Sequence, residues 1–144
     1  MHTVYLSLGT NLGDKERNLH AAIAEIGKRV GSIKAQSAFL ATEPWGFESE
    51  HPFLNAAVRV ETQLTPLALL HTTQQIERDM GRTHKSEGGK YHDRIIDIDI
   101  LLYDDLRLSS PQLTIPHPLM HKRDFVLIPL KEICDNLPPY TPEQ

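Results

Sequence analysis

Two periodic patterns of apolar residues open the chain. Residues 3–9 alternate, with Leu6 and Leu8 separated by polar or small positions, which is typical of a β-strand. From Asp14 to about Val30, aliphatic residues recur at helical spacing, and Asp14 is a residue type that caps helix N-termini. The pattern therefore predicts a strand followed by a helix.

The middle of the chain predicts two more strands and a second helix. Residues 32–46 are typical of a strand that enters a loop marked by Pro44 and Gly46, and residues 53–64 are typical of a further strand. Thr65 followed by proline is a strong helix start, which predicts a helix over residues 66–80. The stretch 82–93 is polar and contains glycines, so it predicts a long loop, a common place for function.

The last third predicts one long strand and a mixed tail. Residues 93–103 alternate as a strand, residues 103–108 predict a turn into a short strand, and residues 114–133 combine a proline-bounded loop with a helical segment. The order β-α-β-β-α-β favours an α+β fold, the ferredoxin-like split βαβ. This fold has an antiparallel sheet with two helices packed on one face, here with a C-terminal appendage. We expect residues 1–144 to form a single domain.

Two aspartates interrupt the most apolar of these strands. Asp97 and Asp99 are two residues apart, so in an extended chain they share one face. The apolar residues expected on the other face are Ile96, Ile98, Ile100 and Leu102. Adjacent carboxylates repel unless a cation lies between them, which points to a divalent metal or an arginine. The alternative is a pair of edge-strand charges that discourages aggregation.

Several basic residues and a histidine lie before and after the aspartate pair along the chain. They are Arg82, Lys85, Arg94, His117 and Arg123. Each alone is more often a solvated surface charge. Magnesium takes one or two carboxylates and completes its shell with phosphate oxygens and water, so the combination predicts a magnesium–nucleotide polyphosphate site.

Composition and net charge limit the classes of protein to which this chain can belong. The chain has 144 residues and a formal net charge of −4, with a pI near 6.0, so overall charge does not favour nucleic acid or a membrane surface. No apolar run is long enough to span a bilayer. A single cysteine, Cys134, excludes an internal disulfide. We expect a cytoplasmic monomer that acts on small molecules and contacts neither nucleic acid nor membrane.

Five motifs follow one another along the chain: GTNLGD, FLNAAV, IERDMGR, DRIIDIDILLY and LTIPHPLMHKRDFVL. Together they resemble a known family, 6-hydroxymethyl-7,8-dihydropterin pyrophosphokinase of folate biosynthesis. The resemblance covers nearly the whole chain. It implies transfer of the β,γ-pyrophosphoryl group of ATP to the hydroxymethyl oxygen of the pterin, which yields AMP and the pterin diphosphate.

The resemblance also implies roles for individual residues. Asp97 and Asp99 would hold two magnesium ions, and Arg82 and Arg94 would assist the transfer. Contacts to ATP are implied for Gln74, Glu77, Ile100, Thr114, His117 and Arg123. Contacts to the pterin are implied for Thr42, Pro44, Trp45, Phe53, Asn55 and Phe125, with the two phenylalanines stacking on the ring and Asn55 offering both a donor and an acceptor.

Two other functions use the same features. An ordinary kinase or nucleotide hydrolase with the same carboxylate pair would release ADP in place of AMP. A non-catalytic ferredoxin-like module would bind a nucleotide or metal without turnover. Fold alone does not separate them, because this scaffold hosts many activities.

Overall fold

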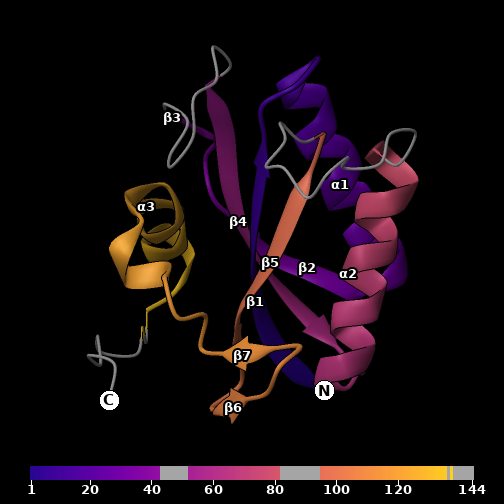
Figure 1. The fold of residues 1–144 in the computed structure, drawn as a ribbon, viewed down its shortest axis with the longest axis vertical. Coiled ribbons are helices and arrows are strands. Elements are labelled where there is room, and N and C mark those ends of the chain that lie inside the picture. The colour runs from indigo at the N-terminus through magenta and orange to yellow at the C-terminus, as the bar shows by residue number, and fades with distance from the viewer. Residues whose placement is uncertain (43–51, 82–94, 136, 138–144) are drawn as a thin grey trace.

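The computed structural model describes residues 1–42, 52–81, 95–135 and 137, and five of its strands form one antiparallel sheet (Figure 1). They are β1 (His2–Thr10), β2 (Gly31–Gln36), β3 (Leu40–Thr42), β4 (Phe53–Thr62) and β5 (Asp97–Tyr103). The strand order is β2-β4-β1-β5, and β3 also pairs with β4. This order is that of a split βαβ arrangement, so the predicted fold class is confirmed.

Helices cover both faces of the sheet. α1 (Lys15–Arg29) and α2 (Pro66–Gly81) lie on one face, and α3 (Asp124–Ile133) lies on the other (Figure 1). Before α3 the chain forms a small hairpin of β6 (Leu108–Ser109) and β7 (Thr114–Ile115), then a short 3₁₀ helix, η1 (Met120–Lys122). The two predicted helices share a face as expected, and the C-terminal appendage forms a third layer.

The first two helices begin where side-chain caps were predicted. The Asp14 carboxylate accepts a hydrogen bond from the Arg17 N–H at 3.2 Å, and Gly13 before it has φ +66°, which favours glycine. The Thr65 hydroxyl accepts from the Ala68 N–H at 3.2 Å. Because the Asp14 carboxylate already occupies the N-terminus of α1, this end is a poor site for a phosphate.

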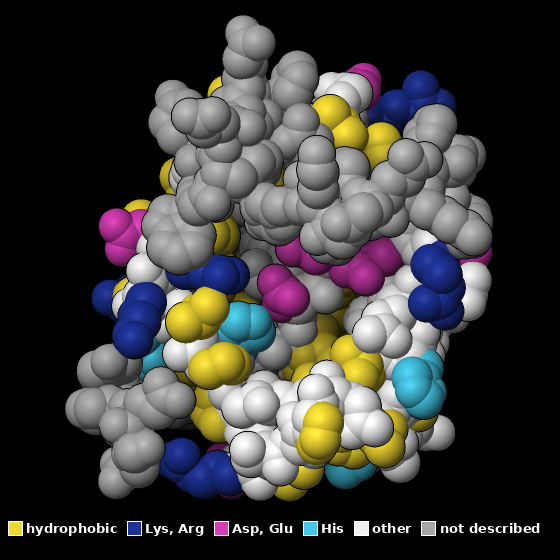
Figure 2. Space-filling view, viewed as in Figure 1, with side chains coloured by type: hydrophobic (Ala, Val, Ile, Leu, Met, Phe, Trp, Pro, Cys, Tyr) yellow, Lys and Arg dark blue, Asp and Glu magenta, His cyan; other side chains and the backbone are white. Residues whose placement is uncertain are grey.

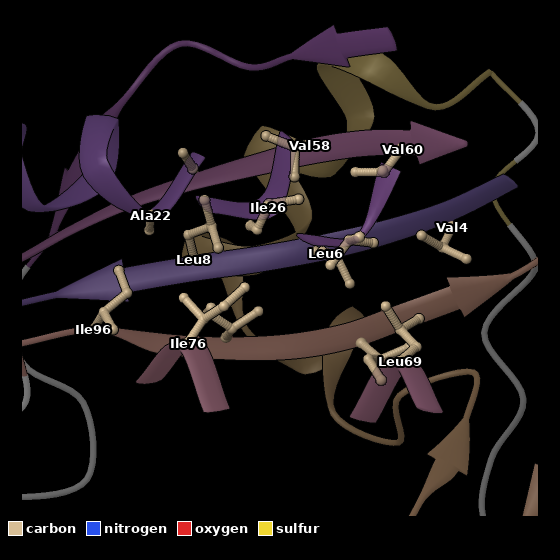
Figure 3. Close-up of a cluster of buried hydrophobic side chains, with 14 of the residues drawn as sticks. Val4, Leu6, Leu8, Ala22, Ile26, Val58, Val60, Leu69, Ile76 and Ile96 are labelled. Carbon is tan, nitrogen blue, oxygen red and sulfur yellow. The ribbon is translucent and has the colours of Figure 1, made fainter. Parts of the chain in front are cut away.

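Aliphatic side chains fill the space between the sheet and α1 and α2. Figure 3 shows Leu6 and Leu8 of β1 beside Val58 of β4, with Ile26 and Ile76 reaching them from the two helices. All five are fully buried. Each such side chain contributes roughly 1.5–3 kcal/mol by leaving water, so this layer supplies much of the stability.

The single strand predicted to begin at residue 32 and to enter a loop at Pro44 is wrong in its continuity. Within the described residues it divides into β2 and β3, and residues beyond 42 lie outside them until 52. The cause is Ser37, whose buried hydroxyl accepts a hydrogen bond from the Ala57 N–H at 2.9 Å and donates to the Ala38 carbonyl at 2.8 Å. A side chain thus takes a place in the ladder that a main-chain carbonyl would otherwise hold.

The predicted face of Leu102 is also wrong. The pairing of β1 with β5 shifts register between Tyr5 and Leu6, so that Leu6 pairs with Ile100 and Tyr5 pairs with Leu102. This bulge inserts one extra residue and reverses the alternation that follows it. Leu102 therefore packs in the cluster beneath α3 with Met120, while Ile100 stays in the core with α1 and α2.

Among the described residues, no helix is long and apolar enough to cross a membrane. The loop predicted over residues 82–93 lies outside the described ranges.

Candidate active site

On the side facing α3, one row of residues crosses four strands. Asp97 of β5 pairs with Gly9 of β1, Gly9 pairs with Asn55 of β4, and Asn55 pairs with Leu40 of β3. The alternate residues of these strands belong to the core with α1 and α2, so the Asp97 and Asn55 side chains point the other way. Strands lie about 4.8 Å apart, which separates the two backbones by about 10 Å.

A second row runs parallel to the first. Asp99 of β5 pairs with Ser7 of β1, and Ser7 pairs with Ala57 of β4. Ser7 and Ala57 are small and buried, and so is Gly9 in the first row. The surface between the carboxylates and Asn55 is therefore made of small side chains.

The aspartate pair has the donor set that magnesium prefers. Asp97 and Asp99 are both half-buried on one face of β5. Within the described residues, no group of three or more His, Cys, Asp or Glu side chains could hold a metal ion, which disfavours a closed protein site. Two carboxylates do fit a magnesium ion that takes its other ligands from phosphate and water. Figure 2 shows acidic side chains gathered on this face, with a histidine and basic side chains beside them toward α3.

Two contacts flank the outer edge of β5, which is the last strand of the sheet. The Glu77 carboxylate accepts a hydrogen bond from the Ile98 N–H at 2.7 Å, and the His117 N–H donates to the Leu101 carbonyl at 3.0 Å. Ile100 lies between them with its side chain 3% exposed in the core. If Ile100 contacts a nucleotide, it must do so through its main chain at this edge.

The His117 ring is held as a neutral donor. Burial lowers the pKa of His117, and the nearby positive charge of Arg123 lowers it further, while Asp97 acts in the opposite direction. The Leu119 N–H donates to His117 Nδ1 at 3.1 Å. Since Nδ1 accepts, the ring proton is on Nε2, so the ring offers a hydrogen-bond donor without a full charge.

The other predicted nucleotide residues come from three elements. Gln74 is exposed on α2, one helical turn before Glu77. Thr114 lies in the short strand β7, half-buried. Arg123 directly precedes α3, and its guanidinium carbon lies 5.8 Å from the centroid of the Phe125 ring. Phe125 is therefore held beside a cation at the start of the helix.

Asn55 is oriented by β3. Its side-chain amide donates to the Thr42 hydroxyl at 3.2 Å and to the Leu40 carbonyl at 3.3 Å. Its Oδ1 points toward β1, because a Cβ built on Gly9 would lie 3.1 Å from it and 3.7 Å from the Phe53 ring. The sequence predicted Asn55 as both donor and acceptor. In the structure the amide N–H groups bond to β3, and the acceptor oxygen faces the site.

Four predicted site residues, Arg82, Arg94, Pro44 and Trp45, lie outside the described residues. Conversely, Gly9 was not predicted as part of the site although it lies at its centre. The alternation over residues 3–9 does indicate that Gly9 lies on the face opposite to Leu6 and Leu8. Only the pairing of β1 with β4 and β5 shows that Gly9 lies between Asn55 and Asp97.

Comparison with known proteins identifies relatives along nearly the whole chain. Residues 5–135 match the family 7,8-dihydro-6-hydroxymethylpterin-pyrophosphokinase (HPPK). A 2-amino-4-hydroxy-6-hydroxymethyldihydropteridine pyrophosphokinase from Porphyromonas gingivalis is 54% identical over 143 residues, which cover 99% of this chain and 97% of that protein. One of the same name from Bacillus subtilis is 41% identical and covers 92% and 78%. These names give no support to a non-catalytic module.

Solved structures share the fold at low identity. A crystal structure of HPPK-DHPS in complex with substrates has a TM-score of 0.70 and 19% identity, and wild-type HPPK-DHPS of Plasmodium falciparum has 0.68 and 18%. Each alignment covers 92% of this chain but only 40% of the other, so the chain spans well under half of those proteins. The family match and the identity to full-length relatives show that this chain belongs to the 7,8-dihydro-6-hydroxymethylpterin-pyrophosphokinase family.

Proposed function

We propose that this chain transfers the β,γ-pyrophosphoryl group of ATP to the hydroxymethyl oxygen of 6-hydroxymethyl-7,8-dihydropterin, giving AMP and the pterin diphosphate in tetrahydrofolate biosynthesis. Family membership makes the chain a pyrophosphokinase that uses ATP and the hydroxymethylpterin. The observation that carries the site assignment is the row in which Asp97 faces Asn55 across Gly9. In this row, a carboxylate that could hold a metal ion and an amide that could hydrogen-bond to a heterocycle lie on the same surface.

On the nucleotide side, we assign Asp97 and Asp99 to two magnesium ions. Bound there, the ions would neutralise the phosphate oxygens of ATP and hold them for attack. The two carboxylates lie on one face of β5, as this role requires. The charges of Asp97 and Arg123 both act on the His117 ring, so these groups lie near one another. His117 Nε2–H and the Arg123 guanidinium would donate hydrogen bonds to phosphate oxygens.

The edge of β5 would receive the base of ATP. The main chain of Ile100 lies there between the contacts of Glu77 and His117. Adenine carries donors and acceptors along its edge, so it can pair with a strand edge as a neighbouring strand would. We assign Gln74 and Thr114, from the two elements beside this edge, to contacts with the nucleoside.

On the other side of β1, Asn55 and Thr42 would recognise the pterin. The Thr42 hydroxyl accepts from Asn55, so its own proton is available to donate, while Asn55 Oδ1 is an acceptor. This pair matches the mixed donors and acceptors of an amino-pyrimidine edge. Phe53 and Phe125 would stack on the two sides of the ring, and Pro44 and Trp45 would add contacts implied by the family resemblance.

The reacting atoms would meet above Gly9 and Ser7. A pterin at Asn55 and phosphates at Asp97 approach each other across β1, where the side chains are small. This arrangement would align the hydroxymethyl oxygen with the β-phosphorus and leave little room for water. Arg82 and Arg94 are assigned, from the family resemblance, to stabilising the charge that shifts during transfer.

The remaining assignments concern the whole chain. We propose that residues 1–144 are a single pyrophosphokinase domain, because the hydrophobic clusters on both faces pack against the same sheet. A monomer that acts in the cytoplasm on small molecules, without nucleic acid or membrane, stays a prediction from composition.

Analysis of nucleotide products tests the function. The protein is incubated with ATP, magnesium and 6-hydroxymethyl-7,8-dihydropterin, and the nucleotides are separated. We expect AMP that requires the pterin and that is lost in both Asp97→Ala and Asp99→Ala. ADP as the product, or no turnover with the pterin present, would contradict the proposal and favour an ordinary kinase or a binding module.

A further inference from the structure

We propose that Glu77 is a positioning residue that holds the aspartate pair in register, acting through the main chain of β5. The family resemblance places Glu77 among the nucleotide contacts, but its carboxylate accepts the N–H of Ile98 at 2.7 Å. Ile98 is the residue between Asp97 and Asp99. The inference rests on the proposed function, since it takes the two aspartates as the metal ligands.

The position of β5 explains why it needs such a contact. Among the described strands, β5 pairs with β1 alone and lies at the edge of the sheet, so its alternate N–H groups face away from β1. The outward N–H at the aspartate pair is that of Ile98. The Glu77 side-chain oxygen accepts this N–H as the carbonyl of a neighbouring strand would, which makes the reach of the side chain, and not its charge, the feature that replaces a missing strand.

A second contact fixes the same helix to the same strand. Gly81 is four residues after Glu77 on α2, on the same side of the helix. A Cβ added to Gly81 would lie 2.8 Å from the Cβ of Ile95, closer than real side chains approach. The end of α2 thus rests directly against the residues that lead into β5, and Glu77 and Gly81 hold this segment at two points.

The geometry of two carboxylates limits how far β5 can move. Magnesium demands a near-ideal octahedral shell at short distances, so a small displacement of one aspartate weakens its binding. Hydrogen bonds that support metal ligands affect affinity about 10- to 100-fold even though they do not touch the metal. Glu77 acts in the same way but through the main chain, because it bonds to the backbone between the two aspartates that would bind the metal.

Two substitutions separate the effect of the length of the Glu77 side chain from the effect of its charge. Glu77→Gln keeps an acceptor oxygen at the same distance but removes the charge, and Glu77→Asp keeps the charge but shortens the side chain. Ile76→Val is the matched control, because Ile76 is buried in the core beside Glu77 and its truncation loosens α2 without removing the acceptor. Two quantities are measured on the full chain: hydrogen exchange of the Ile98 amide, and the affinity for Mn²⁺ in the presence of α,β-methylene-ATP.

If Glu77 positions the strand, Glu77→Asp speeds Ile98 exchange and weakens Mn²⁺ binding about tenfold or more, while Glu77→Gln stays close to the wild type in both. Ile76→Val lowers the melting temperature but leaves Mn²⁺ affinity unchanged. Affinity for the nucleotide analogue without divalent metal is the same in all variants.

Other outcomes overturn the inference. Weak Mn²⁺ binding in Glu77→Gln with normal binding in Glu77→Asp would mean that the charge matters and the main-chain contact does not. Equal loss in both would indicate direct contact with the ligand, and no loss in either would reduce Glu77 to an edge cap without effect on the metal. Failure of the wild type to form AMP would contradict the proposed function, yet the exchange and Mn²⁺ measurements would still decide the role of Glu77.

Discussion

The face of the sheet covered by α1 and α2 and the face toward α3 are made from alternating residues of the same strands. In β1, Leu6 and Leu8 point into the core with the helices, while Ser7 and Gly9 lie on the side of α3. In β5, Ile98 is in the core and its two neighbours are the aspartates. The face of α1 and α2 is apolar along these strands. The other face has small, polar or charged residues at the level of residues 7–9 and 97–99, and packs apolar side chains such as Leu102 only nearer Met120 and α3.

Adjacent residues of one strand therefore have different roles: one contributes to the stability of the core and the next lies at the candidate site. Residues on the face of α1 and α2 are buried among aliphatic side chains, so changing them alters the free energy of unfolding. The small and charged residues on the face of α3, at positions 7–9 and 97–99, lie where ligands would bind, so changing them alters turnover. Adjacent residues of one strand are therefore expected to give opposite experimental results, and the following substitutions test this.

The largest effect is expected at the aspartates. Asp99→Asn keeps the shape but removes a carboxylate from the proposed metal site, so turnover falls about 100- to 1000-fold, the range for one group that stabilises transition-state charge. The metal-free protein melts at the same temperature or higher, because two like charges no longer repel. Product formation and thermal melting are the measurements.

The matched substitution is Ile98→Val, one residue away. It removes a buried methyl group and costs about 0.5–1.5 kcal/mol of stability, with turnover retained. If it lost as much activity as Asp99→Asn, the separation of the two faces would fail for β5.

A large effect of the opposite kind is expected for Leu6→Ala. Leu6 is fully buried in the core, so the substitution costs about 2–5 kcal/mol in the free energy of unfolding. Urea denaturation measures this loss. The turnover number of the folded fraction, corrected by the same denaturation curve, remains that of the wild type. A variant that is stable but inactive would place Leu6 in the site and contradict the comparison.

An intermediate effect is expected for Gly9→Ala. The added Cβ would lie 3.1 Å from Asn55 Oδ1, so the amide must move by a few tenths of an ångström, which changes the geometry of its bonds to β3. The KM for the pterin rises about tenfold, which corresponds to about 1.4 kcal/mol, while stability changes little. Steady-state kinetics with varied pterin give this number.

A second glycine provides the control. A Cβ on Gly27 of α1 meets only Ile33 Cγ1 at 3.8 Å, an ordinary contact. Gly27→Ala therefore stabilises the helix by about 0.5–1 kcal/mol without a change in KM. An equal rise in KM in both variants would show that Gly9 has no special relation to the pterin.

The smallest effect concerns pH and His117. Burial first, then Arg123, lowers the pKa of His117, so the folded state favours the neutral ring. This contribution to stability is fully present above the unfolded pKa of about 6.5 and is lost as pH falls through the lower folded pKa. The melting temperature of the wild type therefore drops more between about pH 7 and pH 5 than that of His117→Gln.

The exposed His71 supplies the comparison for this test. His71→Gln is expected to follow the wild type across the same pH range. If His117→Gln showed the same decline as the wild type, the ring would not be held neutral by its surroundings.

Much of the fold was predictable because it depends on short-range features. The alternation in residues 3–9 and the caps Asp14 and Thr65 involve residues only a few positions apart, and all were confirmed. The pairing of Asp97 and Asp99 on one face followed from the period of a strand. The errors at Ser37 and Leu102 occurred where a contact with a distant strand overrides the local pattern.

The sequence by itself thus determined the order of elements, the family and the residue types of the site. Only the tertiary structure decided that Asp97 and Asn55 lie on either side of Gly9, that Glu77 supports Ile98, and that α3 covers the opposite face. The physical reason is range: periodicity and caps depend on neighbours along the chain, whereas strand order and register come from packing and hydrogen bonding between segments far apart in sequence.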